Sequence, residues 1–296
     1  MKKFIQVKTL LGHKNLDFSI ECLLSFLINS YDKIWITIFE DGTLTSDDIY
    51  RLQTLIPDST VIDRNECEAI ILKKLLHYPS CSHYRKTTIY ARKIFDIMLY
   101  DENDAIYIDS DVFFVKKFKL PDFGLYPVFM YDSENAYSFK PNEFLYIKFL
   151  IFPKVNSGFF YFPSKQFDLD YIELILKDKF IHRGFIRGIS WLEQTVWSFM
   201  ASRYAKLSYF NTLEVVMAQK QLAIDSQTIC VHLVSTYRNH FDKVKKYASD
   251  KYTAAVDNHD GFDIISLVSA RRPLRAYDFY IERIIKTMKR YINQLN

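Results

Sequence analysis

The chain has 296 residues, of which 49% are hydrophobic and 25% are charged. This is ordinary globular usage, sufficient for one large domain or two modest ones, and it excludes a largely disordered chain. The formal net charge of +4 is too small by itself to indicate a nucleic-acid-binding protein, although it suits an anionic small ligand. We therefore expect a folded protein with no nucleic-acid partner. Its oligomeric state has no signature in the sequence.

The sequence predicts neither a secretion signal nor a membrane span. Gln6 and Lys8 interrupt the apolar stretch that would follow the basic residues of a signal. No segment approaches the run of about 18 apolar residues that spans a bilayer. The four cysteines are scattered and include no C-x-x-C pair, which is typical of reduced cysteines rather than of a disulfide or zinc framework. These features predict a cytoplasmic protein.

Strands and helices are predicted to alternate along the first 115 residues. Apolar runs predict strands, and an apolar face with helical spacing predicts helices. The order strand, helix, strand implies parallel βαβ units, so we expect an α/β fold whose mostly parallel central sheet is flanked by helices. The expected elements are strands at 2–11, 33–41, 59–63 and 105–115, and helices at 18–30, 46–56 with Ser46 as N-cap, and 87–100.

Two aspartates, Asp109 and Asp111, follow the apolar segment "AIYI" in residues 105–115. Ligands of open parallel sheets collect beyond the carboxyl ends of the strands, where these side chains are expected. An Asp-x-Asp at such a position can aim its carboxylates at a hard divalent cation, which prefers oxygen ligands. The alternative is a solvated turn, because Asp-Ser-Asp is also good turn chemistry.

Four segments together resemble a known family. "AIYIDSDV" resembles the metal-binding DxD segment of glycosyltransferases with the GT-A fold, in particular the family-8-like group that includes glycogenin and lipopolysaccharide galactosyltransferases. "VNSGFFYFP" is similar to their Asn-Ser-Gly strand, "WLEQTVWSF" to their acidic-Gln motif, and "VHLVSTYR" to their C-terminal His-x-x-Gly-x-x-Lys motif. The segments occur in family order and cover about residues 1–245, so we expect a GT-A domain there and a helical extension at 246–296.

The resemblance implies a metal site and a nucleotide-sugar pocket. Asp109, Asp111 and His232 match the metal ligands, and imidazole suits Mn²⁺ better than Mg²⁺. A lone histidine is nevertheless more often a surface or core residue than a ligand. Ser110 lies between the two aspartates and is assigned to the donor pocket. Thr9 falls where the family begins this pocket.

Basic side chains are expected at the donor phosphates or sugar. Arg92 matches a family arginine upstream of the DxD motif, but it could equally be an exposed helix residue, and Lys93 beside it is a competing candidate. Arg238 stands where the family has Lys and preserves the charge that would neutralise a diphosphate. Ser235 stands where the family has Gly, which puts the close approach of the backbone to phosphate in doubt.

Further side chains are expected around the sugar. Asn156 could bind sugar hydroxyls, and Ser157 and Gly158 continue the same motif, with Gly158 leaving room for the ring. Asn-Ser-Gly is equally ordinary turn chemistry. Glu193 is expected to bind donor or acceptor hydroxyls, and Gln194 to lie near the anomeric carbon. A separate turn, "FEDGT", places Asp41 where many GT-A enzymes have an acidic-Gly turn, although an Asp-Gly turn needs no function.

The reaction implied by the resemblance is transfer of a sugar, with retention of configuration, from a nucleotide-sugar donor, preferably linked to UDP, to a hydroxyl of a glycan or lipid-linked acceptor. Retention of the anomeric configuration is the family's implication and is not visible in any one residue. Two alternatives stay open. A nucleotidyltransferase or phosphatase-like metal enzyme could also use paired aspartates, although no Gly-rich phosphate loop is present. The second alternative is a noncatalytic relic of the fold that binds a sugar or a nucleotide.

The last residues predict an amphipathic helix after Pro273. Tyr277, Ile281, Ile284, Ile285 and Met288 form its apolar face, and basic residues lie elsewhere on it. Such a helix could lie on an anionic membrane surface, which would make the protein peripheral to a membrane. Packing on the helix's own domain is the commoner outcome and is the one we expect.

Overall fold

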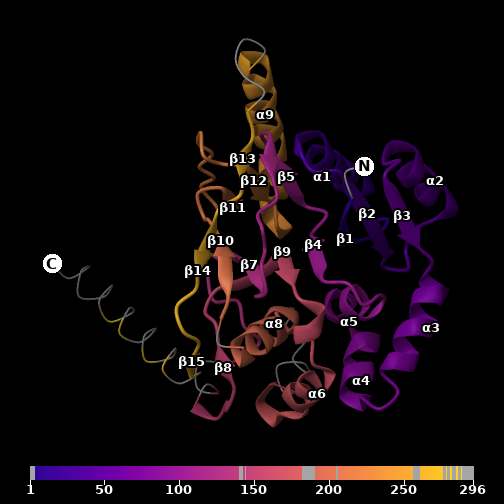
Figure 1. Ribbon diagram of the computed structural model, residues 1–296, viewed down its shortest axis with the longest axis vertical. Helices are drawn as coiled ribbons and strands as arrows, with labels where there is room; N and C mark the ends of the chain where they lie inside the picture. Colours follow the sequence, from indigo (N-terminus) through magenta and orange to yellow (C-terminus); the bar gives the residue numbers. More distant parts are fainter. Residues whose placement is uncertain are drawn as a thin grey trace.

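The computed structural model describes most of the chain (Figure 1). The described residues are 4–139, 143, 145–181, 191–204, 206–255 and 261–275, together with 278, 281, 285 and 288. The prediction of an α/β fold with a mostly parallel central sheet and flanking helices is confirmed. No helix in these described stretches is long and apolar enough to cross a bilayer.

An eight-stranded sheet forms the centre of the molecule, in the order β14-β10-β7-β9-β4-β1-β2-β3. The pairs β1–β2, β1–β4, β2–β3 and β7–β10 are parallel, whereas β9 is antiparallel to both of its neighbours and β14 is antiparallel to β10. The strands are β1 (Ile5–Leu11), β2 (Ile34–Glu40), β3 (Ser59–Ile62), β4 (Ala105–Ile108), β7 (Val128–Tyr131), β9 (Val155–Phe162), β10 (Ser208–Phe210) and β14 (Leu267–Ser269).

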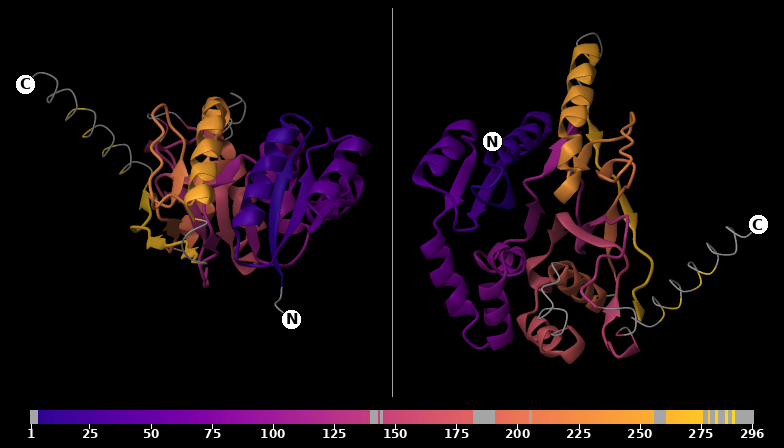
Figure 2. Two further views of the ribbon diagram at one scale, coloured as in Figure 1. Left: turned by 90° about the horizontal axis from the view of Figure 1, so that it is seen from above. Right: turned by 180° about the vertical axis from the view of Figure 1, so that it is seen from behind.

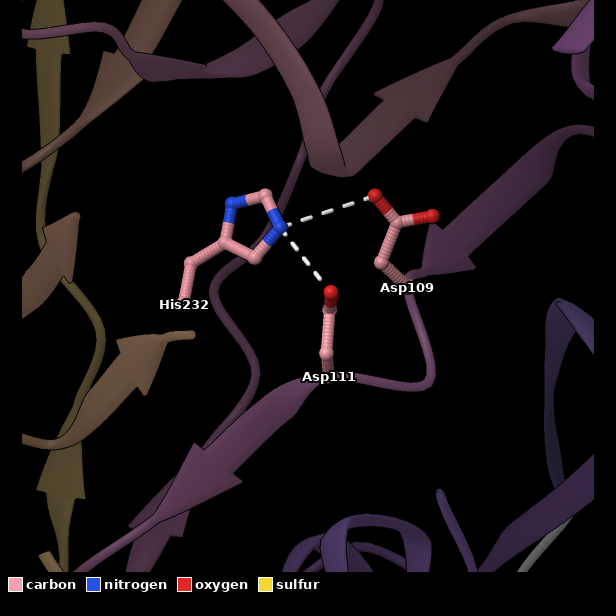
Figure 3. Close-up of side chains that lie close together, drawn as sticks. All are labelled: Asp109, Asp111 and His232. Carbon is pink, nitrogen blue, oxygen red and sulfur yellow. Dashed lines mark ion pairs between the residues drawn. The ribbon is translucent and has the colours of Figure 1, made fainter. Parts of the chain in front are cut away.

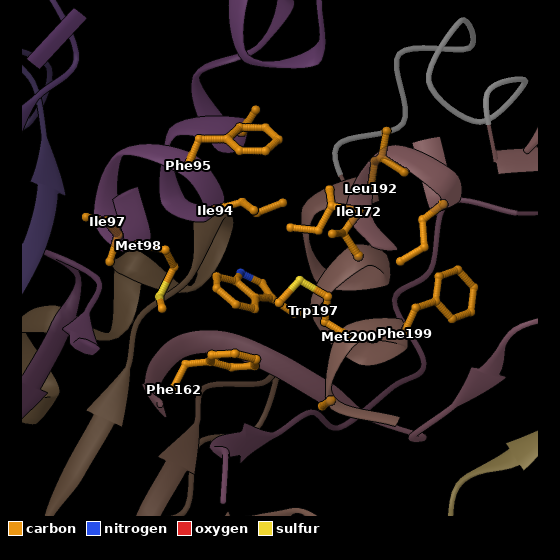
Figure 4. Packing of buried hydrophobic residues seen from close by; sticks show 14 of the residues in the cluster. Ile94, Phe95, Ile97, Met98, Phe162, Ile172, Leu192, Trp197, Phe199 and Met200 are labelled. Atoms are coloured by element: carbon orange, nitrogen blue, oxygen red, sulfur yellow. The ribbon is translucent and has the colours of Figure 1, made fainter. Parts of the chain in front are cut away.

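Helices cover both faces of this sheet. Successive residues of a strand point to opposite faces, so neighbouring residues of one strand contact different helices. On β9, Phe159 shares a buried cluster with the apolar side chains of α1 (Leu16–Asn29) and α2 (Ser46–Leu55). The next residue, Phe160, joins a second cluster with α5 (Arg92–Leu99), α6 (Leu169–Lys177) and α8 (Leu192–Arg203). Trp197 is buried at the centre of the second cluster, against Phe160 and Phe162 (Figure 4).

Helix starts in the first half follow local capping chemistry. Thr45 rather than Ser46 is the N-cap of α2, because its side chain accepts from the Asp48 backbone N–H and Asp48 bonds back in a capping box. The prediction was therefore wrong by one residue. Asp63 caps α3 (Arg64–Lys74) in a similar way, accepting from the first-turn amides. Neither α3 nor the next helix, α4 (Pro79–Thr87), was predicted.

Two predicted elements are divided in the structure. The helix expected at 87–100 consists of a 3₁₀ turn, η1 (Ile89–Ala91), followed by α5. The strand expected at 105–115 consists of β4 and β5 (Val112–Phe114), which belong to different sheets. In the smaller sheet, β5 lies beside β12 (Cys230–His232), which in turn pairs with β11 (Val215–Met217). The break between β4 and β5 contains Asp109 and Asp111.

The C-terminal part is joined to the rest by short strands. Residues 261–275 contribute β13 (Asp263–Ile264), β14 and β15 (Leu274–Arg275), which pair with β6 (Phe118–Lys119), β10 and β8 (Leu150–Ile151). The remaining described elements are η3 (Ser164–Gln166), η4 (Ser235–His240) and α9 (Phe241–Ala255). The boundary proposed at residue 245 falls inside α9, which extends away from the sheets (Figures 1 and 2).

The expected C-terminal helix lies largely outside the described residues, including Tyr277 and Ile284 of its apolar face. Three members of that face, Ile281, Ile285 and Met288, are described and are helical. They are 47–61% exposed. These three side chains are therefore not buried against the domain, contrary to the packing that we expected.

Candidate active site

The cluster of Asp109, Asp111 and His232 lies where the two sheets meet (Figure 3). Asp109 follows the last residue of β4, and Asp111 precedes β5. His232 ends β12 and pairs in register with Val112 of β5, so strand pairing carries it to the aspartates from 121 residues away in the chain. Its Nε2 atom is 3.1 Å from Asp111 Oδ1 and 3.6 Å from Asp109 Oδ2.

These three side chains fit a divalent cation. One ligand atom from each lies within 4.8 Å of the others. Asp111 and His232 are buried, yet among the described residues neither Asp111 Oδ1 nor His232 Nε2 has a hydrogen-bond partner, although the two atoms lie 3.1 Å apart as an ion pair. Buried polar atoms are normally satisfied, and a cation bound between these ligand atoms would satisfy them. Carboxylate oxygen and imidazole nitrogen together suit Mn²⁺, Zn²⁺ or Fe²⁺ better than a purely oxygen-preferring ion.

The charged forms of Asp111 and His232 stabilise each other. Burial would raise the pKa of Asp111, but His232 and Arg238 outweigh it and lower the pKa to about 2. Burial would lower the pKa of His232, but the carboxylates of Asp111 and Asp109 outweigh it and raise the pKa above its ordinary value. Asp111 is therefore an anion at neutral pH.

Gly158 makes room for the histidine. A Cβ atom at this position would lie 2.3 Å from His232 Cε1, a distance that real Cβ atoms do not show. The carbonyl oxygen of Gly158 also accepts a hydrogen bond of 2.6 Å from the Asp109 backbone N–H. Gly158 thus sets the distance between β9 and two of the three metal-ligand candidates, Asp109 and His232. Our expectation was different, since we assigned the glycine to space for the sugar ring.

Lys93 extends the cluster on the side of α5. Its Nζ atom lies 2.8 Å from Asp109 Oδ2, and the Tyr107 hydroxyl donates to the other oxygen of Asp109 at 2.7 Å. Burial would lower the pKa of Lys93, but Asp109 and Glu193 outweigh it and raise the pKa. Arg92 points elsewhere and donates to the Glu40 carbonyl oxygen at 3.1 Å. Lys93, the competing candidate, is therefore the one in contact with the cluster, and the predicted Arg92 is not hydrogen-bonded to it in the described part of the chain.

Glu193 lies behind Lys93 in the first turn of α8. It is buried, and its Oε2 atom accepts a hydrogen bond of 2.8 Å from the Ser157 hydroxyl. Ser157 in turn lies 3.4 Å from Lys93 Nζ. Burial raises the pKa of Glu193, and the nearby Lys93 opposes that shift. The structure therefore joins Glu193, Ser157, Lys93 and Asp109 in one buried chain of polar contacts.

Gln194 and Asn156 meet at an aspartate that the sequence analysis missed. Asp132, directly after β7, is buried, and its Oδ2 atom accepts from Asn156 Nδ2 at 3.1 Å and from Gln194 Nε2 at 3.5 Å. Gln194 Nε2 also lies within 3.4 Å of the Ala136 and Val155 carbonyl oxygens, so its amide nitrogen points into the protein. The available signal was an aspartate following the buried strand "VFMY", the same pattern that drew attention to Asp109.

Arg238 approaches the cluster from η4. Its Nη2 atom lies 2.9 Å from Asp111 Oδ2. Ser235, at the start of η4, has a φ of 52°, which is in the left-handed region that favours glycine. The chain therefore has a glycine-type backbone at the position where the resembled family has Gly.

The other predicted pocket residues are less closely connected to the cluster. Thr9 is fully buried on β1, and its hydroxyl has no hydrogen-bond partner among the described residues. Ser110 accepts a hydrogen bond of 3.2 Å from Ser19. Asp41 binds the backbone and side chain of Thr43. In the described part of the chain, none of these three predicted residues is hydrogen-bonded to Asp111 or His232.

Comparison of the structure with solved structures identifies its architecture. The galactosyltransferase LgtC, solved in complex with donor and acceptor sugar analogues, matches with a TM-score of 0.51 over 83% of this chain and 96% of LgtC, at 10% sequence identity. Mouse xyloside xylosyltransferase 1 matches with a TM-score of 0.52 over 77% of this chain and 97% of the mouse chain, at 11% identity. The chain has the GT-A fold.

The bifunctional glycosyltransferase WbbM shares the GT-A fold over 86% of this chain, with a TM-score of 0.51 and 10% identity. The match spans about half, 52%, of the WbbM chain. No protein-family model matches the sequence, and no curated protein sequence does so either. The likeness is therefore one of fold alone.

Proposed function

We propose that this chain is a metal-dependent glycosyltransferase. It moves a sugar from a nucleotide-sugar donor, with UDP as the preferred carrier, to a hydroxyl of a glycan or lipid-linked acceptor. The observation that supports this most directly is the cluster of the half-buried Asp109 with the buried Asp111 and His232 at the carboxyl end of β4 in a GT-A fold. Ligands of open α/β sheets bind at this edge.

The proposed chemistry is electrostatic. A divalent cation held by Asp109, Asp111 and His232, with Mn²⁺ favoured over Mg²⁺, would supply positive charge to the departing diphosphate. Arg238 binds the same diphosphate and stabilises the charge that develops as the bond to the sugar breaks. Lys93 holds Asp109 in place from the opposite side through the 2.8 Å contact. The cation and Arg238 would therefore act where negative charge increases, which favours the transition state over the ground state.

Gln194 and Asn156 are proposed to face the sugar. Because the amide nitrogen of Gln194 lies near Asp132 and two backbone carbonyls, its side-chain oxygen is the group available to the anomeric centre. A neutral amide oxygen there would stabilise positive charge on the sugar without committing the reaction to a covalent intermediate. This arrangement suits retention by attack of the acceptor on the face that the leaving group vacates.

The test is hydrolysis of a panel of nucleotide sugars without acceptor, with Mn²⁺ or with EDTA. We expect release of nucleoside diphosphate from one donor, dependent on the metal and at least about 100-fold slower in Asp111→Asn, since several kcal/mol of charge stabilisation is lost. Asp17→Asn is the matched control, because Asp17 is an exposed aspartate that pairs with Arg51 outside the cluster. Equal hydrolysis by Asp111→Asn and the native chain would contradict the proposal.

A noncatalytic relic of the fold is the second candidate, favoured by the replacement of the family Gly by Ser235. The φ of 52° at Ser235 argues against it, because the backbone shape is retained despite the side chain. If no donor in the panel is cleaved and none shifts the melting temperature, the noncatalytic relic would be preferred over the enzyme.

Contact with a membrane surface is a further part of the proposal, supported by the exposure of Ile281, Ile285 and Met288. We expect the chain to sediment with vesicles of anionic lipid. Ile285→Asp should sediment less, because a charged side chain replaces an apolar one that the lipid would bury. Equal sedimentation of both chains would remove this part of the proposal and leave the enzymatic part intact.

A further inference from the structure

Each aspartate of the proposed metal site already contacts a basic side chain. Arg238 Nη2 lies 2.9 Å from Asp111 Oδ2, and Lys93 Nζ lies 2.8 Å from Asp109 Oδ2. A cation that binds these carboxylates must therefore share them with two resident positive charges. Like charges brought this close repel one another, and partial burial reduces the screening by water.

The two basic residues differ in how firmly they are held. Lys93 is buried, contacts Ser157, and lies over the ring of Tyr107 with Nζ 5.2 Å from the ring centroid. The Arg238 side chain is 41% exposed and lies over the ring of Phe18, with Cζ 5.6 Å from the centroid. Lys93 is thus a fixed part of the site, whereas Arg238 has access to solvent and can exchange partners.

Arg238 and His232 approach different oxygens of Asp111. Arg238 contacts Oδ2, while His232 Nε2 faces Oδ1, which has no hydrogen-bond partner in the described part of the chain. A cation could therefore bind Oδ1 without removing Arg238 from Oδ2. Its binding would still be weakened, because the guanidinium reduces the negative charge that Asp111 offers.

We propose that Arg238 makes this site select a divalent cation together with a nucleoside diphosphate over the free cation. The inference rests on the proposed function and names the coupling at the same site. In the absence of nucleotide, Arg238 neutralises Asp111 and opposes the cation. A diphosphate offers several charged acceptor oxygens in a geometry that suits a guanidinium fork, so it draws Arg238 away from Asp111. The full charge of Asp111 then becomes available to the metal.

This coupling predicts that removing a side chain of the site strengthens the binding of Mn²⁺. Mn²⁺ affinity is measured by calorimetry on the full chain, alone and with saturating UDP, for the native protein and Arg238→Gln. The substitution removes a positive charge, so it should tighten binding of Mn²⁺ alone by about three- to tenfold. The factor by which UDP tightens Mn²⁺ should fall by a similar amount, and by linkage the factor by which Mn²⁺ tightens UDP should fall equally.

Two further variants separate charge from structure. Arg238→Lys keeps the charge and should leave the affinity for Mn²⁺ alone within about twofold of native, since the charge opposes the cation in either form. Arg51→Gln is the matched control, because Arg51 also pairs with an aspartate but lies outside the site. It should change neither affinity. Unchanged melting temperatures would show that all three variants are folded.

The outcomes distinguish this inference from the proposed function. Native protein that binds Mn²⁺ neither alone nor with UDP would overturn both. Native protein whose Mn²⁺ affinity increases with UDP, combined with unchanged or weaker binding of Mn²⁺ alone by Arg238→Gln, would overturn the inference and leave the glycosyltransferase proposal standing. Tighter binding of Mn²⁺ alone by Arg238→Gln but not by Arg238→Lys would support it.

Discussion

The two halves of the central sheet are built in different ways. Strands β3, β2, β1 and β4 are all parallel and come from residues 5–108, whereas β9, β7, β10 and β14 include antiparallel pairs and come from residues 128–269. The first half supplies Lys93 and the aspartate pair at its end. The second half and the small sheet beside it supply Asn156, Gln194, His232 and Arg238. The first half thus resembles a scaffold assembled from neighbouring segments, and the second gathers polar side chains from distant ones.

The largest expected effect is a loss of stability in the first half of the molecule, at a contact outside the candidate site. Arg85 and Asp96 form a buried bidentate ion pair that joins α4 to α5, with contacts of 2.7 and 3.0 Å. Asp96→Ala leaves the guanidinium buried without this partner, so it should lower the free energy of unfolding by about 3–5 kcal/mol. Urea unfolding followed by circular dichroism measures this. A loss below about 1 kcal/mol would show that the pair contributes little.

A smaller effect on stability, but a larger one on the site, is expected from Gly158→Ala. The added Cβ collides with the His232 ring, so the free energy of unfolding should fall by about 1–3 kcal/mol and Mn²⁺ binding in the presence of UDP should be lost. Gly261→Ala is the control, because a Cβ at Gly261 meets no atom of the described residues within 4 Å. Retention of native metal affinity in Gly158→Ala would refute the contact between β9 and the histidine.

The smallest effect tests the contact between the two halves. Glu173 of α6 accepts hydrogen bonds from the Ser80 and Cys81 backbone N–H groups at the start of α4. Despite burial, which would raise it, these bonds lower the pKa of Glu173 from 4.5 to about 2. The ionised carboxylate therefore stabilises the fold fully above pH 4.5, and this contribution is lost as the pH falls toward 2.

Glu173→Gln should cost about 0.5–2 kcal/mol at pH 7, the range for loss of a helix cap. Its unfolding free energy should also fall less steeply than that of the native chain between pH 5 and 3. Urea unfolding across this range compares the two slopes. Identical slopes would mean that another carboxylate is responsible for the acid sensitivity.

The difference between the halves also explains what the sequence could predict. Strands β1, β2, β3 and β4 and helices α1 and α2 were anticipated because their apolar patterns are local and their order implies parallel pairing. Helices α3 and α4 were missed, since their residues lack a clear apolar face. The division between β4 and β5 was missed because both segments are apolar, and only pairing with β12, more than 100 residues away, separates them.

The sequence could predict which residues belong to the candidate site better than it could predict their contacts. Arg92 and Lys93 are adjacent in the sequence but about 100° apart around a helix, so only the orientation of α5 decides which one reaches Asp109. Asp132 was not considered, although it follows an apolar strand as Asp109 does, because it lies outside the four segments that resemble the family. Its contact with Gln194 depends on how β7 and α8 pack.

The contact between Gly158 and His232 restricts how this protein can change over evolution. Any larger residue at position 158 would require the imidazole to move or a smaller residue at position 232, and either change would remove a ligand candidate. The two positions are therefore expected to vary together and not separately. In related chains, loss of both would mark descendants released from binding a cation, while retention of both would mark those in which the cation still matters.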